Sequence, residues 1–261
     1  MMEAIARFRQ NLRDDRLCLG ASVTLSDPLV SDALGGSVDF IWIDLEHCAM
    51  SPEALAGHLL AARARHVPSL VRVSGSDAAF IKPVLDAGAD GIIFPQVRSV
   101  EEVKQVVTDC RYPPVGQRGY HPRVPSNYGR DGGGDYVERA NKNLFVAVMI
   151  ETAEALEALD AIVAVPGLDS LVIGPQDLSG ALGMLGDLEH PQVVAAMETI
   201  IAKARAAGLA VGAGMGTDTD VVYGMAQRGV QWLQVGCDYG YLTEFMDHFT
   251  SSIRGHLKQV N

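Results

Sequence analysis

The sequence has few of the residues that build two common kinds of site. Only four of its 261 residues are cysteine, and Cys18, Cys48, Cys110 and Cys237 form no CxxC pair. A zinc knuckle or a dithiol redox motif needs such a pair. Both kinds of site are therefore excluded, and we expect reduced thiols and a cytoplasmic protein.

Positive charge is also scarce. The chain has 21 Lys and Arg residues against 32 Asp and Glu residues, a net charge of -11, and its basic residues do not gather in a run. This balance argues against nucleic acid or an anionic membrane surface as a partner. No apolar stretch approaches the ~20 residues that span a bilayer. Residues 1–14 predict an amphipathic helix that is too charged for a secretion signal.

Short apolar runs alternate with helical stretches along the chain. The runs do not alternate between apolar and polar residues, which is typical of parallel strands covered on both faces. Eight strand–helix units predict an α/β fold, a single (β/α)8 TIM barrel over residues 1–261 with an extra N-terminal helix. A doubly wound open sheet is the main alternative, but no GxGxxG motif follows the first strand.

One segment, residues 111–143, interrupts this alternation. It is rich in glycine and proline and is longer than an ordinary connection. Its DGGGD stretch could indicate phosphate binding, but it lies between a helix and a strand and not at a strand-to-helix turn. We expect a flexible linker here.

Ionisable residues stand at the C-terminal ends of several predicted strands, where barrel enzymes carry their active sites. These residues are Asp44, Glu46 and His47 after the second strand, Arg72 in the third, Glu151 after the fifth and Asp177 after the sixth. Separate parts of the chain thus deliver acids, one histidine and one arginine to one mouth.

Glu151 and Asp177 follow neighbouring strands. Two carboxylates without cysteine suit a hard cation that prefers oxygen, such as Mg²⁺ or Mn²⁺. Taken alone, Glu151 could instead be an acid that stabilises a helix start, and Asp177 could be an N-cap. Their coincidence on one face favours a metal site.

Arg72 and His47 are the candidates for contact with a substrate. Arg72 interrupts an apolar strand and could fork onto a carboxylate or an enolate oxygen, or could form a buried salt bridge. Asp44 precedes His47 by three residues and could orient and charge its imidazole. The alternative for His47 is a hydrogen-bonded structural role.

No lysine lies at the C-terminal end of a predicted strand, where Schiff-base chemistry would need one. Four of the five lysines fall on predicted helices, and Lys142 lies at the N-terminal side of the fifth strand. None is placed to form an imine with a ketone. A protein that makes carbanions here must stabilise them with a metal.

The motifs IDLEHCAMSPEAL, VRV, DAGADGIIFPQVRSVEE, RYPPVGQRG, IETAEAL and GPQDLSGALG resemble the HpcH/HpaI family of metal-dependent class II pyruvate aldolases. The resemblance runs from about Leu17 to about Leu242. It implies a reversible cleavage of a 4-hydroxy-2-oxo acid to pyruvate and an aldehyde. It also implies a (β/α)8 barrel that assembles as a hexamer, with C-terminal helices exchanged between subunits.

The resemblance further assigns roles to residues. It implies a divalent metal, Mg²⁺ or Mn²⁺ with Co²⁺ as a third candidate, on Glu151 and Asp177. It implies Arg72 against the keto oxygen, and His47 paired with Asp44 in proton transfer. The segment Gly174, Pro175, Gln176 would receive the pyruvate carboxylate through backbone N–H groups. We expect Glu46 to support the metal through water.

The chain departs from the family pattern at three places. Met149 stands where relatives commonly have glutamine, Tyr120 and His121 follow RG where relatives carry a small apolar residue, and GAGMGTD at 212–218 replaces an apolar stretch. Tyr120 is expected to border the aldehyde pocket. Two other functions stay open: an oxaloacetate decarboxylase or related pyruvate-enolate enzyme, and a non-catalytic, metal-dependent oxo-acid binding protein.

Overall fold

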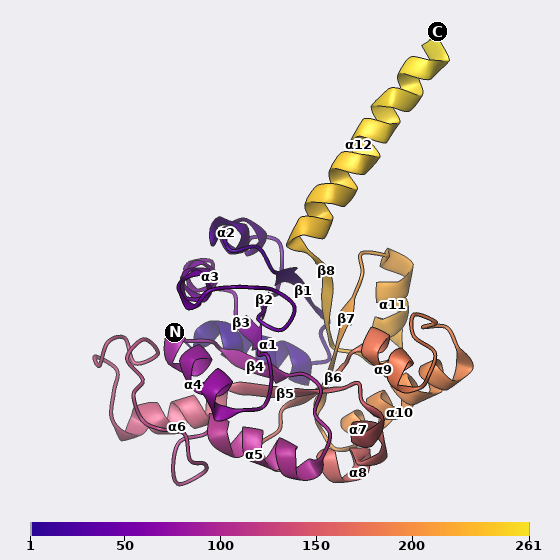
Figure 1. The fold of residues 1–261 in the computed structure, drawn as a ribbon. Helices are drawn as coiled ribbons and strands as arrows, with labels where there is room; N and C mark the ends of the chain where they lie inside the picture. The colour runs from indigo at the N-terminus through magenta and orange to yellow at the C-terminus, as the bar shows by residue number, and fades with distance from the viewer. Residues whose placement is uncertain (1, 261) are drawn as a thin grey trace.

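The eight predicted strands form a closed parallel barrel in chain order, and pairing of the first strand with the eighth closes it (Figure 1). The computed structural model describes residues 2–260. The strands are β1 (Cys18–Val23), β2 (Phe40–Asp44), β3 (Ser69–Arg72), β4 (Gly91–Phe94), β5 (Phe145–Ile150), β6 (Ser170–Ile173), β7 (Ala210–Met215) and β8 (Trp232–Cys237). The predicted (β/α)8 fold is confirmed.

The helices are α1 (Glu3–Arg13), α2 (Leu29–Leu34), α3 (Pro52–Ala64), α4 (Ala78–Ala87), α5 (Val100–Cys110), α6 (Gly134–Asn143), α7 (Ala153–Glu157), α8 (Leu159–Ile162), α9 (Pro175–Ala181), α10 (Pro191–Ala206), α11 (Thr219–Gln227) and α12 (Asp238–Val260). The helices from α2 to α11 join consecutive strands and surround the barrel, whereas α1 precedes β1 and α12 follows β8 (Figure 1). Local sequence sets several starts: the Ser51 hydroxyl accepts from the Ala54 N–H at 3.2 Å, with Pro52 at the first helical position.

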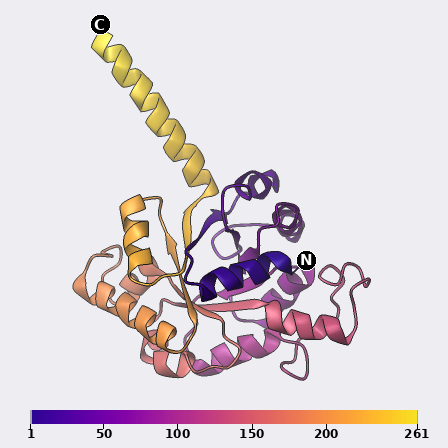
Figure 2. The same cartoon turned by 180° about the vertical axis from the view of Figure 1, so that it is seen from behind.

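Apolar residues pack in two layers, one between strands and helices and one inside the barrel. The predicted N-terminal helix covers the end of the barrel where the strands begin, as Figure 2 shows from behind. The ring of Phe8 in α1 lies 5.5 Å from that of Phe40 and 5.4 Å from that of Phe145, centroid to centroid. Trp232 joins the same cluster at 6.3 Å from Phe8. This end of the barrel is therefore filled by aromatic side chains.

One local prediction was wrong. Residues 134–143 form helix α6 within the segment expected to be a flexible linker, because Tyr136 and Ala140 share one buried face. The glycine- and proline-rich composition of the whole segment hid this short pattern. After β6 the chain forms helix α9, and after β5 it forms two short helices, α7 and α8, that meet at Ala158.

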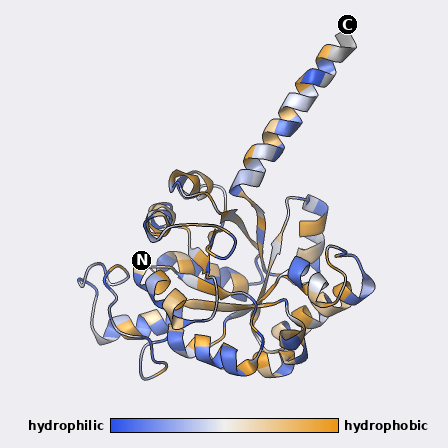
Figure 3. Cartoon of the chain, viewed as in Figure 1, coloured by the Kyte–Doolittle hydropathy of each residue, from blue (hydrophilic) through white to orange (hydrophobic). Residues whose placement is uncertain are grey.

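The C-terminal helix α12 projects away from the barrel (Figures 1 and 2). Figure 3 shows apolar residues interspersed with hydrophilic ones along it. Leu242, Phe245, Phe249 and Ile253 are exposed, and their spacing places them on one side of the helix. In residues 2–260 no helix is long and apolar enough to cross a membrane.

Candidate active site

The C-terminal ends of β2, β3, β5 and β6 bring the predicted ionisable residues into one mouth. The charges of Asp177, Glu46 and Arg72 all act on Glu151. A hollow of about 270 Å³ is lined by Arg72, Gly174, Pro175, Gln176 and Asp177 together with Trp42 and Met149. The structure therefore brings these strand-end residues together around one hollow.

Arg72 and Asp44 form a two-pronged ion pair across neighbouring strands. Asp44 and Arg72 are register partners in β2 and β3. Nε of Arg72 donates to Oδ1 of Asp44 at 3.0 Å, and Nη2 donates to Oδ2 at 2.7 Å. Nη1 lies 2.9 Å from Oε2 of Glu46. These contacts fix the plane of the guanidinium at the mouth.

Burial opposes the positive charge of Arg72, but the hydrogen bonds and charges of the two acids outweigh burial. The pKa of Arg72 is therefore raised above its ordinary value. Arg72 also lies over the ring of Trp42, with its Cζ 5.5 Å from the centroid. Arg72 thus stays charged in an environment that holds it in one orientation.

The acid beside His47 is Glu46 and not Asp44. The Asp44 carboxylate accepts from Arg72 and, at 2.9 Å, from the Glu46 N–H. This bond from the Glu46 backbone to the Asp44 side chain forms a tight turn. The His47 side chain that follows is 62% exposed, and its Nε2 lies 3.5 Å from Oε2 of Glu46. The expected Asp44–His47 pair is therefore replaced by a Glu46–His47 pair. Cys48 donates from Sγ to the Asp44 carbonyl oxygen at 2.7 Å.

Glu46 is the acid that links Arg72 and His47. Desolvation raises the pKa of the Glu46 carboxyl, although Arg72 and His47 both oppose that shift. The expectation that Glu46 only supports a metal through water is thus incomplete, because its carboxylate contacts two of the candidate residues directly.

Glu151 is buried, with only one of its two oxygens bonded. Oε1 accepts from the Gln96 N–H at 2.8 Å and from Nε2 of Gln96 at 3.2 Å. Oε2 is enclosed and has no hydrogen-bond partner in the part of the chain that the structure describes. Burial raises the pKa of Glu151 to about 7, and the charges of Asp177 and Glu46 add to this shift. A cation beside Oε2 would offset both the burial and the repulsion.

Gly174 makes room for the free oxygen of Glu151. A Cβ at this position would overlap Oε2, so any other residue would displace the carboxylate. The orphaned oxygen, the raised pKa and this space together fit a divalent cation at Glu151. Among residues 2–260 no group of three or more His, Cys, Asp or Glu side chains could hold a metal. A magnesium site can consist of one or two carboxylates completed by water and substrate.

Asp177 lies in the first turn of α9, exposed beside the same mouth. The N-cap of α9 is Gly174, so the alternative reading of Asp177 as an N-cap is wrong. Asp177 lines a hollow with Arg72 and a second one with Glu151 and Gln96. Pro175 has no N–H, so the first backbone donor inside α9 is that of Gln176.

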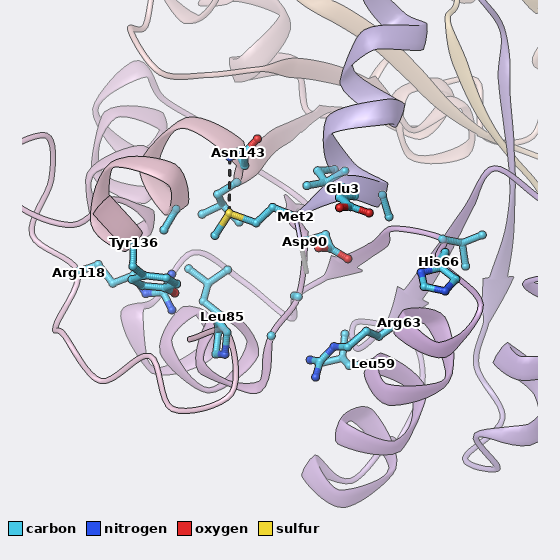
Figure 4. Close-up of a pocket in the computed structure, with 18 residues that line it drawn as sticks. Met2, Glu3, Leu59, Arg63, His66, Leu85, Asp90, Arg118, Tyr136 and Asn143 are labelled. Carbon is cyan, nitrogen blue, oxygen red and sulfur yellow. Dashed lines mark hydrogen bonds between the residues drawn. The ribbon is translucent and has the colours of Figure 1, made fainter. Parts of the chain in front are cut away.

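Tyr120 is not brought to this mouth within one chain. Its side chain is 55% exposed, and its ring packs 5.5 Å from that of Tyr112. Figure 4 shows a different cavity, of about 340 Å³, lined by Tyr136, Arg118, Arg63, Asp90 and others. It lies near the N-terminal ends of β3 and β4, at the opposite end of the barrel, and holds none of the predicted site residues.

Sequence reasoning assigned no role to two residues of the mouth. Gln96 follows β4 in a left-handed backbone conformation, with φ 54°, and binds Glu151 through both its backbone and its side chain. Gln234 of β8 lines the hollow beside Arg72. The available signals were a polar residue just after a strand for Gln96 and a polar residue inside an apolar strand for Gln234.

Comparisons with known proteins find relatives over most of the chain. The sequence profile described as HpcH/HpaI aldolase/citrate lyase matches residues 23–244. The hydroxypyruvate/pyruvate aldolase of Pseudomonas aeruginosa is 32% identical over 252 residues, covering 96% of this chain and 94% of that protein. The 2-keto-3-deoxy-L-rhamnonate aldolase of Salmonella gallinarum is 34% identical over 243 residues, covering 92% and 90%.

Solved structures give the same result for the fold. The crystal structure of an HpcH/HpaI aldolase from Desulfitobacterium hafniense DCB-2 superposes with a TM-score of 0.88 at 28% identity, covering 94% of this chain and 96% of that chain.

Proposed function

The chain belongs to the HpcH/HpaI aldolase/citrate lyase family and is a carbon–carbon lyase of the pyruvate aldolase class, and we propose that it works with a divalent metal held by Glu151 and Asp177. The proposed reaction is the reversible cleavage of a 4-hydroxy-2-oxo acid to pyruvate and an aldehyde. The substrates would be small oxo acids and aldehydes.

One observation carries the metal proposal: the enclosed Oε2 of Glu151 has no hydrogen-bond partner among residues 2–260 and lies in a space that only glycine at 174 permits. Mg²⁺ or Mn²⁺ suits such a carboxylate, and Co²⁺ is a third candidate. When bound, the metal would polarise the 2-oxo group and stabilise the enolate charge.

The remaining roles follow from the contacts of the chain's own residues. Arg72, fixed by Asp44, would donate to the 2-oxo oxygen as negative charge develops there. The segment Gly174, Pro175, Gln176 would receive the carboxylate of the oxo acid. These contacts would orient the substrate before its C3–C4 bond breaks.

Proton transfer is proposed for His47. Its imidazole would accept the proton of the C4 hydroxyl, and the Glu46 carboxylate, 3.5 Å from Nε2, would stabilise the imidazolium. Asp44 would act on this step indirectly, by holding Arg72 and the turn that carries Glu46.

The test is pyruvate release from a panel of 4-hydroxy-2-oxo acids, before and after chelation with EDTA. We expect turnover that disappears on chelation and returns with Mg²⁺ or Mn²⁺. Full turnover after thorough metal removal would contradict the metal proposal. Oxaloacetate belongs in the panel, because decarboxylation of oxaloacetate without any aldol cleavage would favour the related enolate chemistry.

We also propose that α12 packs on a neighbouring subunit. Its exposed stripe of Leu242, Phe245, Phe249 and Ile253 is too apolar for a solvated face. Exchange of this helix within a hexamer would cover the stripe and could bring Tyr120 of one subunit to the mouth of another. The four cysteines are all free, which fits the proposed cytoplasmic location.

A further inference from the structure

The inner face of β7 carries no side chain at alternate positions. Gly212 and Gly214 lie in β7, and Gly216 follows it. Val211 and Ala213, between them, belong to the apolar layer that faces the helices. Because alternate residues of a strand point to opposite faces, the glycines face the barrel interior.

A different group fills the space beside each glycine as β7 runs toward the mouth of the barrel. A Cβ on Gly212 would overlap the ring of Trp232, and one on Gly214 would lie 3.0 Å from Oε1 of Gln234. A Cβ on Gly216 would have no atom within 4 Å. Trp232 and then Gln234 thus replace the missing side chains, and above them the wall is open.

This open wall borders the candidate active site. One hollow of about 270 Å³ is lined by Gly214, Gly216 and Gln234 on one side and by Arg72, Gly174 and Asp177 on the other. Pockets for drug-sized ligands begin at roughly 300 Å³. A three-carbon oxo acid is much smaller than such a ligand, so the hollow has room for further substrate atoms.

The chemistry of the β7–β8 wall is polar but uncharged. Nε2 of Gln234 donates to the Gly236 carbonyl oxygen, and no donor within residues 2–260 reaches its Oε1. An amide oxygen with free lone pairs accepts from a hydroxyl group. Arg72 is the only cation that lines this hollow in the described chain, and Asp44 and Glu46 already hold it. The wall therefore suits a hydroxyl and offers nothing to a second carboxylate.

We propose that Gln234 and the glycine face of β7 form a specificity pocket for an uncharged, hydroxyl-bearing part of the substrate. This inference rests on the proposed function, which puts the oxo-acid end of the substrate at Arg72 and Asp177. The hydroxyl can belong to the donor half, as in hydroxypyruvate, or to the aldehyde half, as in glyceraldehyde. Either presents the same O–H group to Oε1 of Gln234.

The test uses two pocket variants and one control. Gly216→Val places a side chain in the open wall, and Gln234→Leu keeps the approximate size but removes the acceptor. Gly36→Val is the control, since Gly36 is exposed and a Cβ there meets only the Ala33 carbonyl, at 4.0 Å. Gly216→Ala adds a single methyl and replaces the valine variant if valine unfolds the barrel.

The kinetic constants of each protein are measured in the synthetic direction, with Mn²⁺, for pyruvate or hydroxypyruvate paired with acetaldehyde or glyceraldehyde. We expect Gly216→Val to lower kcat/KM at least about tenfold for the pairs that use the pocket, because the added side chain excludes the substituent. Gln234→Leu should lower it about three- to tenfold, as expected for one lost hydrogen bond. For pyruvate with acetaldehyde, kcat/KM of both pocket variants should change less than threefold. The control variant should have the kcat/KM of the parent for every pair.

The reagent pair that is affected identifies the half that carries the hydroxyl. Losses limited to reactions with hydroxypyruvate place it on the donor, and losses limited to glyceraldehyde place it on the acceptor; each supports the pocket. Equal losses for all four pairs, or none for any, overturn the pocket and leave the aldolase assignment intact. No turnover of any pair by the parent protein contradicts the proposed function itself.

Discussion

The backbone N–H of Gln96 donates to Oε1 of Glu151 at 2.8 Å, and its side-chain Nε2 lies 3.2 Å from the same oxygen. Gln96 reaches this position in a left-handed conformation, with φ 54°, which costs a residue other than glycine about 1–3 kcal/mol. This conformation directs the backbone N–H of Gln96 toward Glu151, at the end of the neighbouring strand β5. One oxygen of Glu151 is thereby fixed, and the other is left for a ligand.

Gln96→Ala should weaken Mn²⁺ binding several-fold, because it removes the side-chain bond that orients Glu151 while the backbone bond stays. Gln96→Gly should weaken it similarly but raise the melting temperature relative to Gln96→Ala, since glycine adopts positive φ without strain. Titration calorimetry and thermal unfolding measure the two effects separately. Equal melting temperatures for the two variants would show that the conformation carries no strain.

Glu151→Gln should abolish tight Mn²⁺ binding, because a neutral amide replaces the buried carboxylate. The metal-free variant should be more stable than the metal-free parent at pH 8, where the parent's acid, with its pKa of about 7, is ionised at a cost. Glu154→Gln is the control, since Glu154 is an exposed acid that pairs with Arg98 at 3.0 Å. Retained Mn²⁺ affinity in Glu151→Gln would place the metal elsewhere.

The Glu46–His47 contact can be separated from the Asp44–His47 alternative by double-mutant cycles on kcat/KM. Glu46→Gln with His47→Ala should be non-additive by about 0.5–1 kcal/mol, the range for a partly exposed ion pair. Asp44→Asn with His47→Ala should be closer to additive, because Asp44 bonds to Arg72 and a backbone amide. A larger coupling in the Asp44 cycle would restore the pairing expected from sequence.

Asp90, at the cavity of Figure 4, should make stability depend on pH. Burial raises its pKa from 3.8 to about 6 although Ser69 donates to its Oδ2 from N at 3.1 Å and from Oγ at 3.2 Å. The folded state thus binds the proton more tightly than the unfolded state does. The resulting stabilisation is complete below pH 3.8 and is lost as the pH rises through about 6.

Asp90→Asn cannot titrate, so the stability of the parent relative to this variant should fall by about 1 kcal/mol between pH 5 and pH 8. Urea unfolding at the two pH values measures the difference. Asp86→Asn is a suitable reference, because Asp86 is a neighbouring acid that pairs with Arg118 at 2.7 Å. If the stability of the parent relative to Asp90→Asn rose with pH, the folded state would not bind the Asp90 proton more tightly, contrary to this prediction.

Phe249→Glu should dissociate the proposed assembly, since a charge on the apolar stripe of α12 cannot be buried against a neighbour. Ser251→Glu adds the same charge on the opposite side of the helix and should leave the assembly intact. Light scattering on the peaks eluted from a size-exclusion column gives the mass of each variant in solution. An unchanged mass for Phe249→Glu would mean that the stripe is not an interface.

Strand-end residues such as Arg72, Glu151 and Asp177 could be located from sequence, because a buried apolar run and its end are local signals. The partner of His47 could not, because it depends on a turn in which the Glu46 N–H bonds back to Asp44. That bond is invisible in the spacing of the two residues. The direction of a side chain after a strand depends on the local backbone geometry. The spacing of apolar residues in the sequence does not encode that geometry.

The role of Gln96 and the presence of helix α6 were not predicted, for different reasons. The role of Gln96 depends on a left-handed backbone that a glutamine adopts only because its surroundings impose it. Helix α6 has an ordinary amphipathic pattern, with Tyr136 and Ala140 buried one turn apart. Averaging composition over the whole glycine-rich segment concealed it, so a shorter window would have found it.

Gly212 and Trp232 occupy one volume between them, since the indole fills the space that a side chain on Gly212 would need. The sizes of the two side chains are therefore coupled: a larger side chain at one position requires a smaller one at the other. We expect natural relatives to vary the two positions in concert. Redesign of the pocket must begin one layer higher, at Gly214 and Gly216, where the two strands are no longer locked together by a ring.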